Sequence, residues 1–179
     1  LKVMEEPPEG VLFLLTADSL AGVLPTIRSR CISFAMAPVS PEDCARYCTA
    51  QGVGAKDAAL YSALFDGHIG TVLAAARDEA RREQVDRALA LAKAAAAKDS
   101  YAAAVLLAAY EKDKAGASAL LADFRAVAAA GLRDSTHSPV EGETARKALG
   151  AADAAMQQIS AQVNPKIVLS VLAAKFRTF

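Results

Sequence analysis

The chain has 179 residues, enough for one ordinary domain or two small ones with a real core, so a disulfide-stapled miniprotein is excluded. Hydrophobic residues make up 54% of the chain, and its 43 alanines, the best helix formers, predict a mainly α protein and exclude an all-β fold. Twenty basic residues balance twenty acidic ones, so net charge gives no argument for a nucleic-acid or membrane partner.

The first segment, residues 1–10 (L-K-V-M-E-E-P-P-E-G), is typical of the tail of a helix that Pro7-Pro8 stops. We expect the beginning of this helix to precede the first residue and the sequence to be a fragment. The segment lacks the basic and apolar regions of a signal peptide, and no apolar run approaches the roughly 18–20 residues that span a bilayer. We therefore expect a soluble, cytoplasmic protein without a membrane partner.

Two short segments near the start have strand patterns. Val11 to Thr16 (V-L-F-L-L-T) is a continuous apolar run, typical of a strand buried on both faces of a parallel sheet. Cys31 to Met36 alternates with a period of two. Two strands cannot make an independent sheet, so we expect residues 1–37 to be the edge of a larger α/β domain.

Residues 38–80 predict a three-helix unit. Ser40-Pro41-Glu42-Asp43 supplies an N-cap hydroxyl, a first-turn proline and two carboxylates, and Gly52 ends this helix. A second helix is predicted from about Lys56 to Phe65. A third begins near Gly70, and its apolar spacing continues to about Lys98.

Residues 81–179 predict a second helical domain with four longer helices, over 86–97, 100–112, 115–133 and 141–163. A last helix opens at Asn164-Pro165, which serve as N-cap and first-turn proline. Asp134 to Pro139 is predicted to be a surface loop.

Three groups of side chains are candidates for metal, nucleic-acid or catalytic sites: the cysteines, an arginine cluster and the two histidines. Cys31, Cys44 and Cys48 have no nearby histidine, which favours reduced thiols over disulfides or zinc, and Cys44 and Cys48 are predicted to be core residues of one helix. Several of the arginines at positions 77, 81, 82 and 87 share a helix face that could contact DNA phosphates, but interleaved carboxylates favour a salt-bridged, solvated face. His68 and His137 have no nucleophile or carboxylate pattern beside them.

Three pieces of the first forty residues, in this order and spacing, resemble the end of the nucleotide-binding domain of AAA+ clamp-loader subunits: residues 1–10, the V-L-F-L-L-T-A-D run, and L-P-T-I-R-S-R-C at 24–31. The resemblance implies that Thr16, with its neighbour Ala17, occupies the sensor 1 position. It also implies that Arg30, within Ser29-Arg30-Cys31, is an arginine finger that reaches the ATP of the neighbouring subunit. Arg28 is either a surface charge or a second anion contact.

The residue types suit this chemistry. Phosphoryl transfer spreads negative charge over the γ-phosphate oxygens, and a permanently charged guanidinium supplied from outside stabilises it. A hydroxyl at the carboxyl end of a buried parallel strand, as expected for Thr16, lies where such sheets place ligand-contacting groups.

The motifs that bind phosphate and magnesium are missing. The sequence holds no G-x-x-x-x-G-K-[ST] loop and no acidic Walker B strand, so this chain is not expected to be an ATPase or to hold a cofactor. Thr71 stands at the sensor 2 position, where the ATPase subunits of the family keep an arginine. Together with the R-S-R-C motif, the threonine at this position makes the chain more similar to the delta-prime (δ′) type of the bacterial DNA polymerase III loader than to the tau/gamma type.

The resemblance implies three parts: residues 1–37 as the remnant of the AAA+ domain, 38–80 as the lid, and 81–179 as a helical collar that packs in a ring of five subunits. The implied function is a non-hydrolysing stator, and ATP and magnesium would belong to the neighbouring subunit. The implied partners are the tau/gamma and delta subunits and, through the complex, the sliding clamp and primed DNA. The alternatives are a tau/gamma-type ATPase subunit and an unrelated helical protein-interaction domain.

Overall fold

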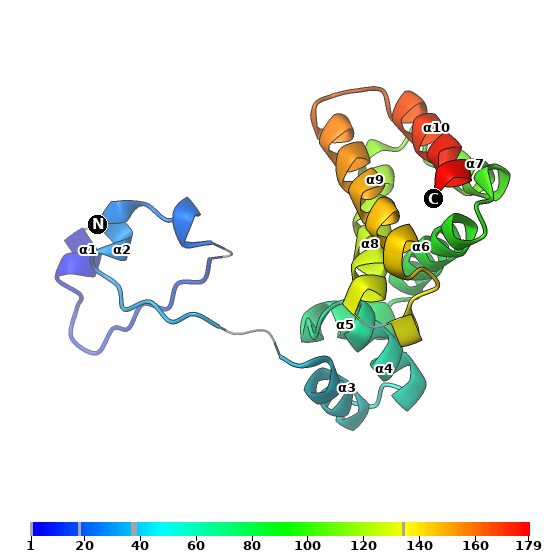
Figure 1. The fold of residues 1–179 in the computed structure, drawn as a ribbon. Helices are drawn as coiled ribbons and strands as arrows, with labels where there is room; N and C mark the ends of the chain where they lie inside the picture. Colours follow the sequence, from blue (N-terminus) through cyan, green and yellow to red (C-terminus); the bar gives the residue numbers. More distant parts are fainter. Residues whose placement is uncertain (1, 18, 37–38, 134) are drawn as a thin grey trace. The chain divides into compact units, whose positions relative to one another are not determined.

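The computed structural model describes residues 2–17, 19–36, 39–133 and 135–179, and they are mostly helical (Figure 1). The chain divides into two compact units, Leu1–Ala37 and Pro38–Phe179. The mainly α fold predicted from the alanine content is confirmed. The further division of the second unit into a lid and a collar stays a prediction.

The first unit holds three short helical segments, α1 (Lys2–Glu5), η1 (Leu20–Gly22) and α2 (Pro25–Arg28). The two strands predicted at 11–16 and 31–36 are wrong for the described part of the chain, where neither segment forms a strand or pairs with another one. Their apolar side chains face solvent, and Leu12 and Leu14 are 80% and 86% exposed. The reason is physical: an apolar strand needs neighbouring strands for its backbone hydrogen bonds, and no described segment supplies them.

The second unit begins with three helices, α3 (Pro41–Ala50), α4 (Ala55–Leu64) and α5 (Ile69–Arg77). Ser40 caps α3 as predicted, because its side chain accepts a hydrogen bond from the Asp43 amide at 3.1 Å. The predicted continuation of the third helix to Lys98 is wrong. Asp78 ends α5 and caps the next helix by accepting from the Ala80 amide at 3.0 Å.

Five helices complete this unit: α6 (Glu79–Ala96), α7 (Ser100–Ala108), α8 (Lys114–Arg133), α9 (Gly142–Ser160) and α10 (Pro165–Lys175). A last turn, η3, follows at Phe176–Thr178. Within the predicted loop at 134–139, Ser135–His137 form a 3-10 turn, and Asp134 lies outside the described residues.

Alanine faces bring the long helices together. Helix α8 packs between α6 and α9, while α10 packs on α7 and α9 (Figure 1). The buried faces of α6, α8 and α9 are rich in small side chains, which lets helix axes approach closely: Ala88, Ala92, Ala95, Ala117, Ala128, Ala145, Ala148, Ala152 and Ala155. Larger side chains fill the remaining space, and the rings of Phe124 and Phe176 stack with their centroids 5.8 Å apart.

Helix α8 is the one helix in the described residues that is long and apolar enough to cross a membrane, judged by length and composition alone. Half of its apolar window is buried within the unit, and Asp123 lies in its middle. This is the burial expected of a core helix that its neighbours surround.

The cap of α10 gives a first prediction. The Asn164 side chain accepts a hydrogen bond from the Lys166 amide at 3.0 Å. Asn164→Ala is expected to lower the free energy of unfolding by about 1 kcal/mol, and hence the melting temperature by about 2–4 °C, because that amide loses its acceptor. Asn164→Asp, which keeps an acceptor, should melt near the wild-type temperature. An unchanged melting temperature for Asn164→Ala would show that this cap does not stabilise the helix.

A pair of glycines gives a second prediction. A Cβ on Gly131 of α8 would collide with the Val140 carbonyl and lie 2.9 Å from the Ser138 hydroxyl, whereas a Cβ on Gly150 of α9 would meet nothing within 4 Å. In urea denaturation, Gly131→Ala should destabilise the protein by about 1–3 kcal/mol through overpacking. Gly150→Ala should stabilise it by about 0.5–1 kcal/mol, since alanine favours the helix. Equal effects of the two substitutions would contradict the close approach at Gly131.

Candidate functional site

Arg30 follows the single turn of α2. Pro25 occupies the first position of this helix, where its missing N–H leaves no bond unmade and its fixed φ suits the helix. The chain then tightens, because the Ser29 amide donates to the Pro25 carbonyl and the Arg30 amide to the Ile27 carbonyl, both at 3.0 Å. These bonds place the Arg30 side chain directly after the turn.

The Arg30 guanidinium has partners on two elements of the first unit. Its Nη1 donates to the Thr26 carbonyl at 2.7 Å and to the Ser29 hydroxyl at 3.3 Å. Its Nη2 forms an ion pair with the Glu5 carboxylate on α1. The side chains of Arg30 and Glu5 remain 34% and 42% exposed, so an anion from outside can still reach the guanidinium.

Three other predicted site residues of the first unit lie in or beside this turn: Arg28, Ser29 and Cys31. Ser29 also donates from its hydroxyl to the Thr26 carbonyl at 3.2 Å. Cys31 is a half-buried free thiol. Arg28 is exposed, and its side chain has no hydrogen-bond or ion-pair partner among the described residues. Thr16 is exposed in the irregular segment after α1 and is not among the side-chain partners of Arg30 in the described structure, which are Thr26, Ser29 and Glu5.

Thr71 lies in the second unit, half-buried in the first turn of α5. The turn before it contains Gly67 and His68, whose Nδ1 lies 2.7 Å from the Phe65 carbonyl. Gly67 has φ +73°, and a Cβ there would collide with the Val39 carbonyl, so the turn requires glycine. The roles suggested for the predicted site residues stay predictions: Thr16, Arg28, Ser29, Arg30, Cys31 and Thr71.

The arginine-rich face of α5 and α6 is occupied by partners within the protein. Arg77 donates to the Gln51 carbonyl at 3.1 Å, Arg82 donates to the Ala76 carbonyl, and Arg87 pairs with Glu83 and donates to the Tyr110 hydroxyl at 3.0 Å. Of the interleaved carboxylates predicted to pair with these arginines, Glu83 alone forms such a pair in the described part of the chain, with Arg87. Carbonyls, Tyr110 and a distant aspartate supply the other acceptors.

That aspartate is Asp123 on α8. It receives two bonds from the Arg81 guanidinium, of which the Nη2–Oδ1 distance is 2.6 Å, and the pair is largely buried. The hydrogen bonds to Asp123 raise the pKa of Arg81. The same guanidinium lies 5.4 Å from the centre of the Phe65 ring, at the end of α4.

The cysteines are free thiols, and the described residues hold no group of three or more side chains that could bind a metal ion together. Cys44 and Cys48 are buried core residues of α3, as their spacing predicted. Burial raises the pKa of the Cys48 thiol, and the neighbouring Cys44 raises it further. Cys48 is therefore an unreactive, protonated thiol at neutral pH.

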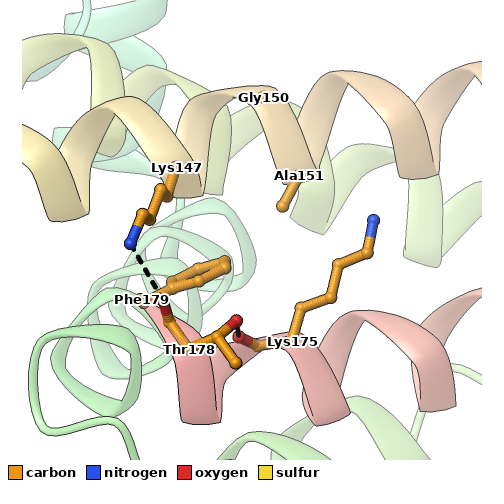
Figure 2. A pocket seen from close by; sticks show the side chains of 6 residues that line it. All are labelled: Lys147, Gly150, Ala151, Lys175, Thr178 and Phe179. Atoms are coloured by element: carbon orange, nitrogen blue, oxygen red, sulfur yellow. Dashed lines mark hydrogen bonds between the residues drawn. The ribbon is translucent and has the colours of Figure 1, made fainter.

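An open groove of about 510 Å³ lies between α9 and the last helical turn (Figure 2). Its lining residues are Lys147, Gly150, Ala151, Lys175, Thr178 and Phe179. The Lys147 ammonium already donates to the Thr178 carbonyl at 3.0 Å. The lining side chains offer two ammonium groups and no carboxylate, imidazole or thiol, so the groove holds no pair for acid–base chemistry.

Reasoning from the sequence missed Glu5 and Asp123, which form ion pairs with Arg30 and Arg81. Both partners are far from their arginine along the chain, and no local spacing rule connects them. Asp123 had one weak signal, because it is an acidic residue on the otherwise apolar face of a predicted core helix.

Residues 1–40 match the family model described as "DNA polymerase III, delta subunit". No curated protein matches the chain, and no solved structure does. The matched segment contains α1, α2 and Arg30 and covers less than a quarter of the sequence. It supports a relation to the clamp-loader type of DNA polymerase III subunit, and thus to a component of a replicative polymerase complex.

The Arg81–Asp123 pair gives a third prediction. Asp123→Ala should destabilise the protein by about 3 kcal/mol, because it leaves the Arg81 charge partly buried without its partner. The matched control is Asp153→Ala, which removes a pair between Arg125 and Asp153 that is about half exposed and should cost less than about 1 kcal/mol. Urea denaturation measures both, and similar small losses would contradict a structural role for Asp123.

Proposed function

We propose that this chain is a delta-prime-type subunit of the bacterial DNA polymerase III clamp loader, a cytoplasmic stator that hydrolyses no ATP itself. The observation that carries the proposal is the family match on residues 1–40, which includes Arg30 and the helix before it. The R-S-R-C motif and the threonine at position 71, where the ATPase subunits of the family keep an arginine, support the delta-prime type over the tau/gamma type.

In this proposal, Arg30 acts on the ATP of the adjacent tau/gamma subunit. The neighbour would supply the nucleotide, its magnesium and the attacking water, and Arg30 would add positive charge where the γ-phosphate oxygens gain negative charge. Its position after a tight turn and its exposed guanidinium suit a group that acts outside its own domain. Ser29 and Cys31 frame the arginine, Thr16 takes the sensor 1 position and Thr71 the sensor 2 position.

The second unit would then serve assembly. Helices α3 to α5 would form the lid, and the alanine-rich helices from α6 onward would form the collar that joins the ring of subunits. With the delta subunit, the ring would open the sliding clamp and load it on primed DNA.

The proposal gives a fourth prediction. In the full-length subunit, Arg30→Ala should leave folding and ring assembly intact, because its ion pair is exposed and contributes little stability. The ATPase rate of the reconstituted loader, with clamp and primed DNA present, should fall. The fall should lie between a few-fold and roughly 10³–10⁵-fold, the range for such arginines, and nearer the small end because other interfaces keep their own fingers.

Two variants control this experiment. Arg30→Lys should rescue poorly, since an ammonium does not reproduce the planar fork of donors. Arg28→Ala removes an exposed side chain of the same turn that has no hydrogen-bond or ion-pair partner among the described residues, and it should have the smaller effect. Equal ATPase rates for wild type and Arg30→Ala would remove Arg30 from the mechanism.

A further inference from the structure

The Arg30 guanidinium is fixed from two sides. Its Nη1 is held by the Thr26 carbonyl and the Ser29 hydroxyl of its own turn, and its Nη2 is held by the Glu5 carboxylate of α1. The hydrogen-bond acceptors that the turn supplies belong to residues within four positions of Arg30 in the sequence. Glu5 is therefore the contact that fixes the outer end of the side chain against a second element.

The ion pair contributes little to folding. Both side chains are about a third or more exposed, and pairs of this kind add little to stability. No described residue of the first unit is buried, so α1 and α2 share no apolar core that Glu5 would complete. The effect of Glu5 is instead on orientation, because an arginine side chain has many rotamers and an anchored guanidinium has few.

The contacts also leave part of the guanidinium free. The Nε–H of Arg30 has no partner in the described structure, and Nη2 has a second N–H beyond the one that faces Glu5. Arginine binds phosphate oxygens through such neighbouring N–H groups. A guanidinium held in this way keeps donors for an incoming phosphate.

We propose that Glu5 is a positioning residue for Arg30, which orients the guanidinium toward the γ-phosphate of the neighbouring subunit's ATP. This inference rests on the proposed function. Glu5 touches neither nucleotide nor metal and acts only through Arg30. Because Glu5 already restricts the rotamers of Arg30, the arginine loses less conformational entropy when it reaches the transition state.

The test is Glu5→Gln in the full-length subunit, assembled into the loader with clamp and primed DNA. We define the Arg30-dependent part of kcat as the wild-type kcat minus the kcat of Arg30→Ala. Glu5→Gln should lower this part about two- to five-fold, which corresponds to the free energy of an exposed ion pair. The KM for ATP should stay unchanged, because the neighbour binds the nucleotide. Glu5→Asp, which keeps the charge, should recover part of the loss.

Glu6→Gln is the matched control, since Glu6 is the adjacent carboxylate and its side chain has no hydrogen-bond or ion-pair partner in the described structure. It should leave the rate at the wild-type value. In the Arg30→Ala background, Glu5→Gln should have no further effect, because Glu5 acts through Arg30.

The outcomes separate the two proposals. If Arg30→Ala lowers the rate but Glu5→Gln leaves it unchanged or raises it, the finger role stands and the positioning role of Glu5 is overturned. An equal loss from Glu5→Gln in the Arg30→Ala background also overturns it. If Arg30→Ala itself has no effect, both proposals are overturned.

Discussion

The paired bonds between Arg81 and Asp123 are the constraint on which the second unit depends. A carboxylate in the middle of a core helix is costly to bury, and it is tolerated here because a guanidinium of α6 meets both of its oxygens. The same guanidinium contacts Phe65, at the end of α4. One charged pair thus fixes how α6 meets α8 and joins both to the helices that precede them.

Different interactions hold the two units together. The second unit is held by close alanine packing and a largely buried ion pair. The first unit has no buried residue among those described, and its best-defined contact is the exposed pair between Arg30 and Glu5. The Arg30 guanidinium stays partly exposed, and its position is set by hydrogen bonds and an ion pair rather than by burial.

Local signals predicted the helices well, and long-range contacts explain what was missed. The caps at Ser40 and Asn164 are each specified by a polar side chain followed by proline. The strands at 11–16 and 31–36 were wrong because an apolar run encodes a strand only where other strands lie beside it. Arg30 was predicted as a site residue from a sequence motif. Its partner Glu5 was not predicted, because it lies on another element and no spacing rule connects the two residues.

The central claim is that Arg30 reaches the nucleotide of a neighbouring subunit. The most direct measurement replaces Arg30 with a photo-crosslinking amino acid in the full-length subunit, assembles the loader with a non-hydrolysable ATP analogue, and maps the crosslinked peptides by mass spectrometry. The account predicts crosslinks to the adjacent ATPase subunit, in the peptides that surround its bound nucleotide. Crosslinks confined to the subunit's own chain would contradict it.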